Sequence, residues 1–173
     1  DNKIICGNYI ISNGNDEIYG TEHHEILFGQ YGNDVLNGGA GDDVLVGGVG
    51  ADTYVFNGNW GQDHIMDFNA DNHMYFRDVN AKDVAFVRDG EDLLIQKLNS
   101  SEQVRVMGQF KNTTDMDAQV IVNWEFADGQ ILKASDVNAV TQMTNAMAAI
   151  GNMDAAAIPS NFNTQLNIQL AAA

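Results

Sequence analysis

Apolar positions in the first half of the chain recur with a period of nine residues. Written in nines from residue 11, six units carry an apolar residue at position eight: Ile18, Leu27, Leu36, Leu45, Tyr54 and Ile65. Glycine clusters separate these positions. Because successive side chains of a strand point to opposite faces, each unit predicts a short strand with one inward side chain, preceded by a turn. Two units then form one coil, and stacked coils form two parallel sheets around a narrow core.

Position six of every unit is acidic. Turns of the same parity should align along one edge of the stack, eighteen residues apart. We call Asp16, Asp34 and Asp52 the first edge, and Glu25, Asp43 and Asp63 the second edge. The second edge is stretched by two inserted residues, Phe56 and Asn57.

The charge distribution gives these acids a role. The chain holds 24 acidic and 8 basic residues, a formal net charge of −16, and residues 11–76 hold eleven Asp or Glu and no Lys or Arg. Such a surface repels nucleic acid and anionic membrane and attracts cations. Carboxylates stacked in a compact fold need a counter-ion. Oxygen-only sites with many ligands suit Ca²⁺, whereas Zn²⁺ prefers His and Cys.

Two units, GGAGDDVLV (38–46) and GGVGADTYV (47–55), match the pattern G-G-x-G-x-D-x-U-x completely. This is the calcium-binding repeat of the RTX (repeats-in-toxin, haemolysin-type) family, which the first third of the chain resembles. A flexible Gly/Asn-rich linker would not explain the apolar residue at position eight. The resemblance implies several Ca²⁺ ions between adjacent coils, each held by a position-six carboxylate and carbonyls of the glycine turns. The residues implied are Asp16, Glu25, Asp34, Asp43, Asp52, Asp63 and Asp71, with Gly14, Gly32, Gly39, Gly41, Gly48, Gly50 and Gly61.

Two stretches leave alternatives open. TEHHE (21–25) invites a zinc interpretation, but it lacks the His-Glu-x-x-His spacing, and a weakened or empty calcium turn is the preferred prediction. Whether Glu25 binds metal together with His23 and His24 stays open. Residues 67–78 carry acids and amides at EF-hand-like positions, but they lack the glycine at position six and helical flanks. We expect the last, irregular turn of the roll there, with Asp71 completing the first edge.

The pattern of apolar residues and turns changes after the roll. Apolar runs bracket Asp-Gly turns at 89–90 and 128–129, and Val104 and Val106 alternate between them. This pattern predicts a small antiparallel β unit that covers the open end of the roll, with Trp124 and Phe126 in its core. Ser135 or Asp136 is expected to cap a helix that runs to about Ile150. Val137, Val140, Met143 or Thr144, Met147 and Ile150 would form its apolar face.

The predicted fold is therefore mainly all-β: a parallel β-roll, a small antiparallel β cap and a carboxyl-terminal helix. Residues 1–10 are a lead-in, 11–76 the calcium-binding roll, 77–133 the capping segment, and 134–173 the helix and tail. The sole cysteine, Cys6, excludes an internal disulfide. We find no amino-terminal signal peptide, no membrane-spanning run and no catalytic motif, so any activity is expected upstream.

The tail, 151–173, consists of small, amide and aliphatic residues without a basic one. It resembles the uncleaved export signal of type I secreted proteins; a disordered end without a role is the alternative. The resemblance implies a secreted, extracellular or cell-surface protein whose partner is the type I apparatus, an ABC transporter and a membrane fusion protein. The roll would stay unfolded at low calcium and fold outside the cell, which promotes export and folding of upstream cargo. The alternatives are a calcium-dependent adhesin or surface-layer segment, or the non-catalytic tail of a toxin or enzyme. A membrane or cell-surface partner would then be reached through upstream domains.

Overall fold

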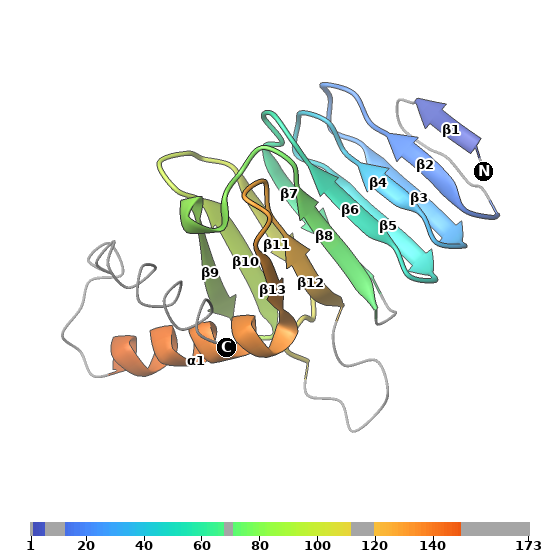
Figure 1. The fold of residues 1–173 in the computed structure, drawn as a ribbon. Helices are drawn as coiled ribbons and strands as arrows, with labels where there is room; N and C mark the ends of the chain where they lie inside the picture. The colour runs from blue at the N-terminus through green and yellow to red at the C-terminus, as the bar shows by residue number, and fades with distance from the viewer. Residues whose placement is uncertain (1, 6–12, 68–70, 112–119, 150–173) are drawn as a thin grey trace.

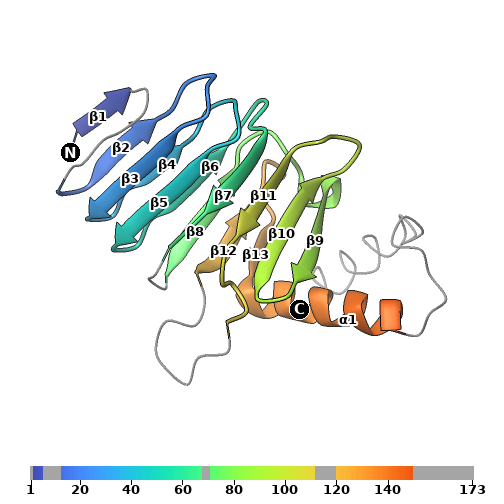
Figure 2. The same cartoon turned by 180° about the vertical axis from the view of Figure 1, so that it is seen from behind.

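The computed structural model of the chain describes residues 2–5, 13–67, 71–111 and 120–149 (Figure 1). Two sheets face each other, and successive strands of the roll alternate between them (Figures 1 and 2). The first sheet is ordered β1 (Asn2–Ile5), β2 (Asp16–Tyr19), β4 (Val35–Asn37), β6 (Thr53–Phe56), β8 (Asn72–Phe76), β12 (Ile121–Glu125) and β13 (Ile131–Lys133). The second is ordered β3 (Ile26–Tyr31), β5 (Val44–Val49), β7 (Gln62–Ile65), β11 (Gln103–Val106), β10 (Asp92–Lys97) and β9 (Val84–Asp89).

The pairing register confirms the nine-residue period. Strands of the roll pair in parallel with an offset of eighteen residues, as in Ile18↔Leu36 and Leu27↔Leu45. After the inserted Phe56 and Asn57 the offset becomes twenty in both sheets, for example Tyr54↔Met74. Strands β3 and β5 run for six residues, longer than predicted, because their ladder continues to the pair Tyr31↔Val49.

The core of the roll is one side chain thick. The position-eight residues of both sheets stack inward and are fully buried: Ile18, Leu27, Leu36, Leu45, Tyr54 and Ile65, followed by Met74. Toward the capping segment the core becomes aromatic. The ring of Phe76 stacks on Phe56 and on Phe126, with centroids 5.4 and 5.3 Å apart, and Trp124 meets Phe86 edge to face. Trp124 and Phe126 are core residues, as predicted.

The capping segment extends both sheets of the roll instead of packing across their ends. Strand β11 pairs in parallel with β7, and β12 pairs in parallel with β8. Only beyond these two strands does the pairing turn antiparallel, in β9–β10–β11 and β12–β13. Both predicted Asp-Gly hairpins form, and a short 3₁₀ helix, η1 (Ala81–Asp83), precedes β9.

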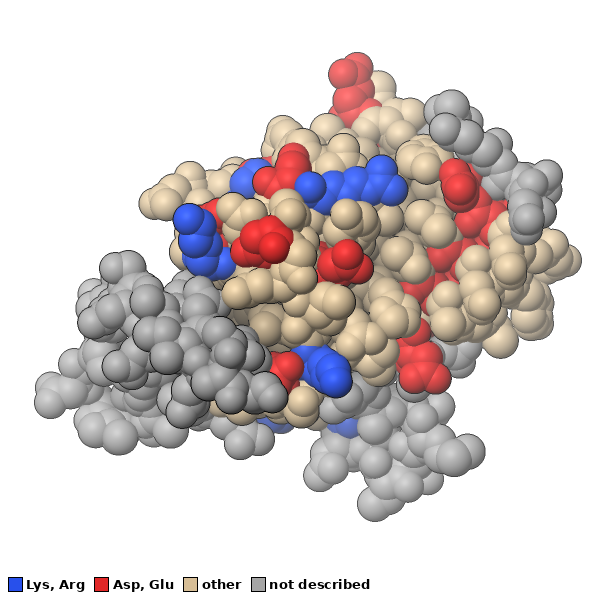
Figure 3. Space-filling view, viewed as in Figure 1, with Lys and Arg blue, Asp and Glu red and all other residues tan. Residues whose placement is uncertain are grey.

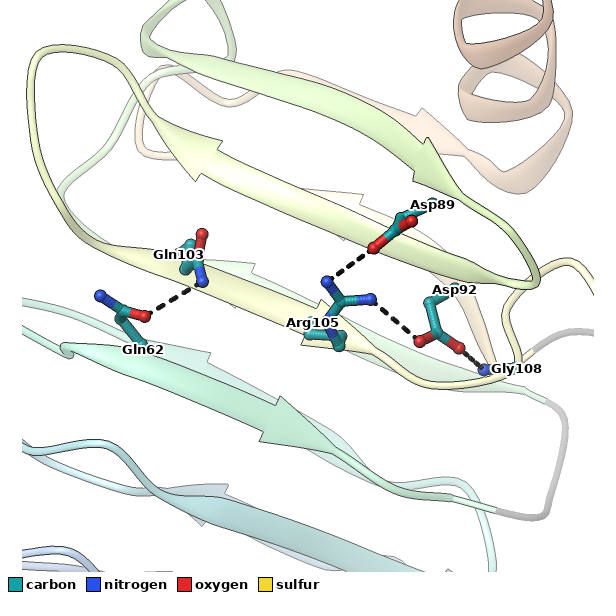
Figure 4. Close-up of polar contacts among 6 residues, drawn as sticks. All are labelled: Gln62, Asp89, Asp92, Gln103, Arg105 and Gly108. Carbon is teal, nitrogen blue, oxygen red and sulfur yellow. Dashed lines mark hydrogen bonds and ion pairs between the residues drawn. The ribbon is translucent and has the colours of Figure 1, made fainter.

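Polar contacts on the outer face of the second sheet tie the capping strands together (Figure 4). Arg105 of β11 forms ion pairs with Asp92 (3.0 Å) and Asp89 (2.8 Å) at the β9–β10 turn. The other carboxylate oxygen of Asp92 accepts the N–H of Gly108 (2.9 Å). The Gln103 side chain donates to that of Gln62 (3.2 Å), across the parallel β11–β7 pair. These contacts hold the hairpin against the strand that continues the roll.

Helix α1 (Ala134–Ala149) follows β13 directly and packs against β9, β12 and β13. It starts one residue before Ser135, because the Asp136 carboxylate accepts the N–H of Lys133 (2.9 Å) from within the first turn. Asp136 is therefore not the capping residue itself, and the predicted start is corrected to Ala134. Val137 and Val140 are buried as predicted. The side chains of Met143, Thr144 and Met147, and residue Ile150, lie outside the described part, as does the tail. No helix among the described residues is long and apolar enough to cross a membrane.

The thin core makes each inward residue important to stability. Leu45 is completely buried, whereas Val49, on the same strand, is 54% exposed. We predict that Leu45→Ala lowers the free energy of unfolding by about 3 kcal/mol, because it opens a cavity that the stacked coils cannot close. The matched Val49→Ala change should cost less than about 0.5 kcal/mol. Denaturant unfolding in saturating calcium compares them, and equal losses would contradict a one-side-chain core.

Candidate metal centre

Four of the position-six carboxylates, those of Asp34, Asp43, Asp52 and Asp63, join two neighbouring coils through a backbone hydrogen bond. On the first edge, the N–H of Asp16 donates to Asp34 Oδ1 and the N–H of Asp34 donates to Asp52 Oδ1, both at 2.8 Å. On the second edge the same bonds run from the N–H of Glu25 to Asp43, and from that of Asp43 to Asp63, again at 2.8 Å. Both edges thus form with the spacing that the sequence predicts.

The first edge ends at a different residue from the one predicted. The N–H of Asp52 donates to Asn72 Oδ1 (2.8 Å), so Asn72, and not Asp71, continues the series. Asp71 is exposed and has a φ of 75°. The two-residue insertion lengthens the step to twenty on both edges, and Asp71 lies one residue short of that step. Residues 72–76 form strand β8 of the roll, so this region is the last turn of the roll and not an EF-hand.

The second oxygen of each of these carboxylates has an unusual environment. Oδ2 of Asp34, Asp43, Asp52 and Asp63 is buried and has no hydrogen-bond partner. Burial raises the pKa of all four, and a neighbouring carboxylate on the same edge raises it further. The pKa reaches about 6 for Asp43, about 7 for Asp52 and about 8 for Asp63, against an ordinary 3.8. A buried anionic oxygen without a hydrogen-bond donor lowers the stability of a fold unless a cation neutralises it.

The glycine turns bring backbone oxygens close to these acids. At position one, a Cβ on Gly29, Gly38 or Gly47 would collide with Oδ2 of the aspartate in the same unit. At positions two and four, a Cβ would collide with the carbonyl of the equivalent residue one coil earlier. Gly32, Gly39, Gly41, Gly48, Gly50 and Gly61 have this environment; Gly14, in the first described turn, has open space. All seven predicted glycines have positive φ.

The arrangement therefore offers carboxylate and carbonyl oxygens, the donors that Ca²⁺ prefers. Among the described residues, no group of three or more His, Cys, Asp and Glu side chains is placed to hold a metal ion. An ion here would draw on backbone carbonyls as well as carboxylates. The residues present fit calcium: the donors are hard oxygens, and four buried carboxylate oxygens lack a partner.

The turn at residues 21–25 differs from the others. Both oxygens of the Glu25 carboxylate are satisfied by Thr21: Oε2 accepts its N–H (3.0 Å) and Oε1 accepts its hydroxyl hydrogen. His24 is also engaged, since its Nδ1 accepts the N–H of Asp42 (3.0 Å). The acid of this turn already has protein donors, which favours the weakened calcium turn over a zinc site.

Charge on the surface follows the sequence. On the face seen in Figure 3, basic side chains lie over the capping segment and its junction with the roll. The right-hand part of the view, where the roll lies, shows acidic side chains without basic ones, in agreement with the absence of Lys and Arg from residues 11–76. Residues 11–76 therefore hold no basic side chain of their own to balance these acids.

Residues 12–30 and 19–54 match the family model of the RTX calcium-binding nonapeptide repeat, which spans four copies of the unit. Residues 12–54 carry RTX repeats. The match lies where the geometry places the stacked turns and their carboxylates. RTX repeats bind calcium, and Ca²⁺ is the metal that the described donors fit.

Two solved structures illustrate the similarity. The chain is 27% identical to the AlgE6R3 subunit of the Azotobacter vinelandii mannuronan C5-epimerase, with 66% of this chain and 82% of that chain covered and a TM-score of 0.38. It is 24% identical to the extracellular lipase LipA from Serratia marcescens, with 66% and 21% covered and a TM-score of 0.36. The chain thus spans about a fifth of the length of the lipase. No curated protein matches the chain.

The raised pKa values predict a pH dependence of the metal-free roll. Because Asp43, Asp52 and Asp63 have higher pKa values folded than unfolded, the folded state favours their protonated forms. The free energy of unfolding without metal should fall as pH rises from about 5.5 to 9, by at least about 1 kcal/mol. Thermal unfolding of metal-stripped protein measures this change. A combined Asp52→Asn and Asp63→Asn variant should show a weaker dependence, and an unchanged slope would contradict the assignment to these groups.

The glycine at position two supplies a second prediction. Gly48 has a φ of 109°, and a Cβ there would collide with the carbonyl of Gln30 on the adjacent coil, whereas Gly58 has a φ of 71° and open space. Both Gly48→Ala and Gly58→Ala strain the backbone, but only Gly48→Ala also separates two coils. We expect Gly48→Ala to destabilise the protein by about 2 kcal/mol more than Gly58→Ala and to weaken calcium binding. Similar unfolding midpoints for the two variants would contradict close coil stacking.

Proposed function

We propose that this chain is the calcium-binding RTX region in the carboxyl-terminal part of a type I secreted protein, which folds when Ca²⁺ fills the two edges. The observation that carries the proposal is the row of buried aspartate oxygens without a hydrogen-bond partner, on Asp34, Asp43, Asp52 and Asp63. A fold with this row is incomplete without cations. The match to the calcium-binding repeat supplies their identity.

The ligands on the first edge would be carboxylates of Asp16, Asp34 and Asp52 with carbonyls near Gly14, Gly32, Gly48 and Gly50. On the second edge they would be Asp43 and Asp63 with carbonyls near Gly39, Gly41 and Gly61, and Glu25 would contribute least because Thr21 satisfies its carboxylate. Bound calcium supplies the positive charge that these oxygens lack. The carboxylates hold the coils together through Oδ1 and leave Oδ2 to the ion.

Folding and export would then be coupled through calcium. Where free calcium is scarce, the aligned carboxylates repel each other and the one-side-chain core cannot hold the coils, so the segment stays unfolded enough to thread a channel. Outside the cell, calcium at roughly 10⁻⁴–10⁻³ M, the range of extracellular calcium modules, folds the roll. Folding at the exported end would hinder return of the chain and promote folding of upstream cargo.

The partner in this proposal is the type I secretion apparatus, an ABC transporter with a membrane fusion protein. Residues 151–173 would carry the signal, without an amino-terminal signal peptide, and residues 11–76, 77–133 and 134–173 would act as roll, cap and export segment. Any catalytic activity would lie in another part of the protein.

A second candidate, a calcium-dependent adhesin or surface-layer segment, is favoured by the outer face of the second sheet. Tyr31 and Val49 form a directly paired, exposed apolar row, 61% and 54% exposed, and Met66 and Met107, which directly follow β7 and β11, are also exposed. Such a face suits contact with another surface. Calcium-dependent oligomers in solution would support this candidate, and a monomer at saturating calcium would argue against it.

A pair of neighbouring substitutions tests the main proposal. Asp43 is buried and Asp42 is exposed, and both accept a backbone N–H through Oδ1, which an Asn can also do, as Asn72 shows. We predict that Asp43→Asn raises the calcium concentration at half-folding by about tenfold or more, because it removes the buried charge. Asp42→Asn should stay within about twofold of the wild type.

Circular dichroism during a calcium titration gives the measurement, with metal-stripped protein as the starting state. The wild type should gain β-structure as calcium is added and lose it in chelator. A wild-type roll that stays fully folded, with the same melting temperature, after chelation would refute calcium-coupled folding.

A further inference from the structure

One buried acid of the roll does not belong to position six of any repeat. Asp67 is 6% exposed and lies directly after the last of the six units. The offset of twenty between β6 and β8 aligns Asp67 with Gly47, which is position one of its unit. Asp67 therefore occupies a position-one place, where Gly20, Gly29, Gly38 and Gly47 stand in earlier units.

The same turn lacks its position-six acid. Asn72 keeps the backbone link by accepting the N–H of Asp52, but its amide carries no charge. At the equivalent place on the second edge, Asp63 accepts the N–H of Asp43 and is acidic. The final step of the first edge is thus one negative charge short, unless a nearby acid provides it.

Asp67 lies where it can provide that charge. Oδ2 of Asp52, buried and without a hydrogen-bond partner, and the hydroxyl oxygen of Tyr54 both come closer than 3.0 Å to the place that a Cβ on Gly47 would occupy. The Tyr54 hydroxyl accepts the N–H of Gly47 (2.9 Å) and donates to Oδ2 of Asp67. The charge of Asp67 also helps to raise the pKa of Asp52, which agrees with two neighbouring carboxylates.

We infer that Asp67 and Asp52 together bind a Ca²⁺ ion at the last turn of the first edge, with Asp67 supplying the carboxylate that Asn72 lacks. The acid has moved from position six to position one of the same unit. Tyr54 is a positioning residue, because its hydroxyl fixes Asp67 beside the unpartnered oxygen of Asp52. This inference rests on the proposed calcium-binding function and adds a ligand outside the repeat pattern.

A purely structural role for Asp67 would predict different behaviour. If its carboxylate serves only to accept the Tyr54 hydroxyl, removing its charge should change the stability of metal-free and calcium-bound protein equally. Calcium binding would then be unaffected. If it binds the ion, the loss appears in calcium affinity and stoichiometry.

The test is isothermal titration of the full chain with calcium chloride, comparing wild type with Asp67→Asn and Asp71→Asn. Asp71 is a matched control, an exposed acid four positions away. We expect Asp67→Asn to lose one calcium ion from the stoichiometry, or to weaken one site at least tenfold, and Asp71→Asn to titrate as the wild type. Tyr54→Phe should keep the stoichiometry and weaken the same site less.

Wild-type stoichiometry and affinity in Asp67→Asn would overturn the inference and leave the proposed function standing. A wild-type chain that binds no calcium would overturn both. If Asp67→Asn does not fold at saturating calcium, the Tyr54→Phe/Asp67→Asn double variant replaces it. That variant leaves no phenol hydroxyl unpaired, and the same two outcomes decide.

Discussion

The fold depends on carboxylates whose two oxygens have opposite effects on its stability. Through Oδ1, each of the four aspartates Asp34, Asp43, Asp52 and Asp63 accepts a backbone N–H from the preceding coil, so it holds two coils together. Its other oxygen is buried with no donor, and the charge on it opposes the fold that the first oxygen supports. The core between the sheets is one side chain thick and offers little hydrophobic free energy per coil to offset that charge. Cation binding resolves the conflict.

The capping segment has the opposite character. Its core is built from stacked and edge-to-face aromatic rings. The ion pair between Lys97 and Glu102 (2.8 Å) covers Trp60, with the Lys97 ammonium over the indole ring. Because β11 and β12 continue the two sheets of the roll, this segment gives the last coil a paired edge on both sheets. In a solenoid each unit contacts only its neighbours, so a firm end can act as a template for adjacent coils.

Much of this architecture could be predicted from one repeated apolar position, since alternation alone fixes which side chain points inward. The two edges followed from the same period. The prediction that Asp71 completes the first edge was wrong. An insertion between two turns shifts every later turn, and the sequence does not show how the two sheets accommodate it. The parallel pairing of β11 with β7 was missed because the alternation of Val104 and Val106 shows burial but not the partner strand. The role of Asp67 needs the register, since no motif marks an acid at position one.

The switch from parallel to antiparallel pairing after β11 and β12 also gives the molecule a direction of growth. An eighteen-residue segment duplicated between β3 and β4 would add one coil, and with it one new space between adjacent coils on each edge. The register of every other strand would be preserved. No such segment fits between β12 and β13, whose hairpin closes the first sheet. Length, and with it the number of cations that a single chain gathers, can therefore change by gene duplication without redesign of the hydrophobic end.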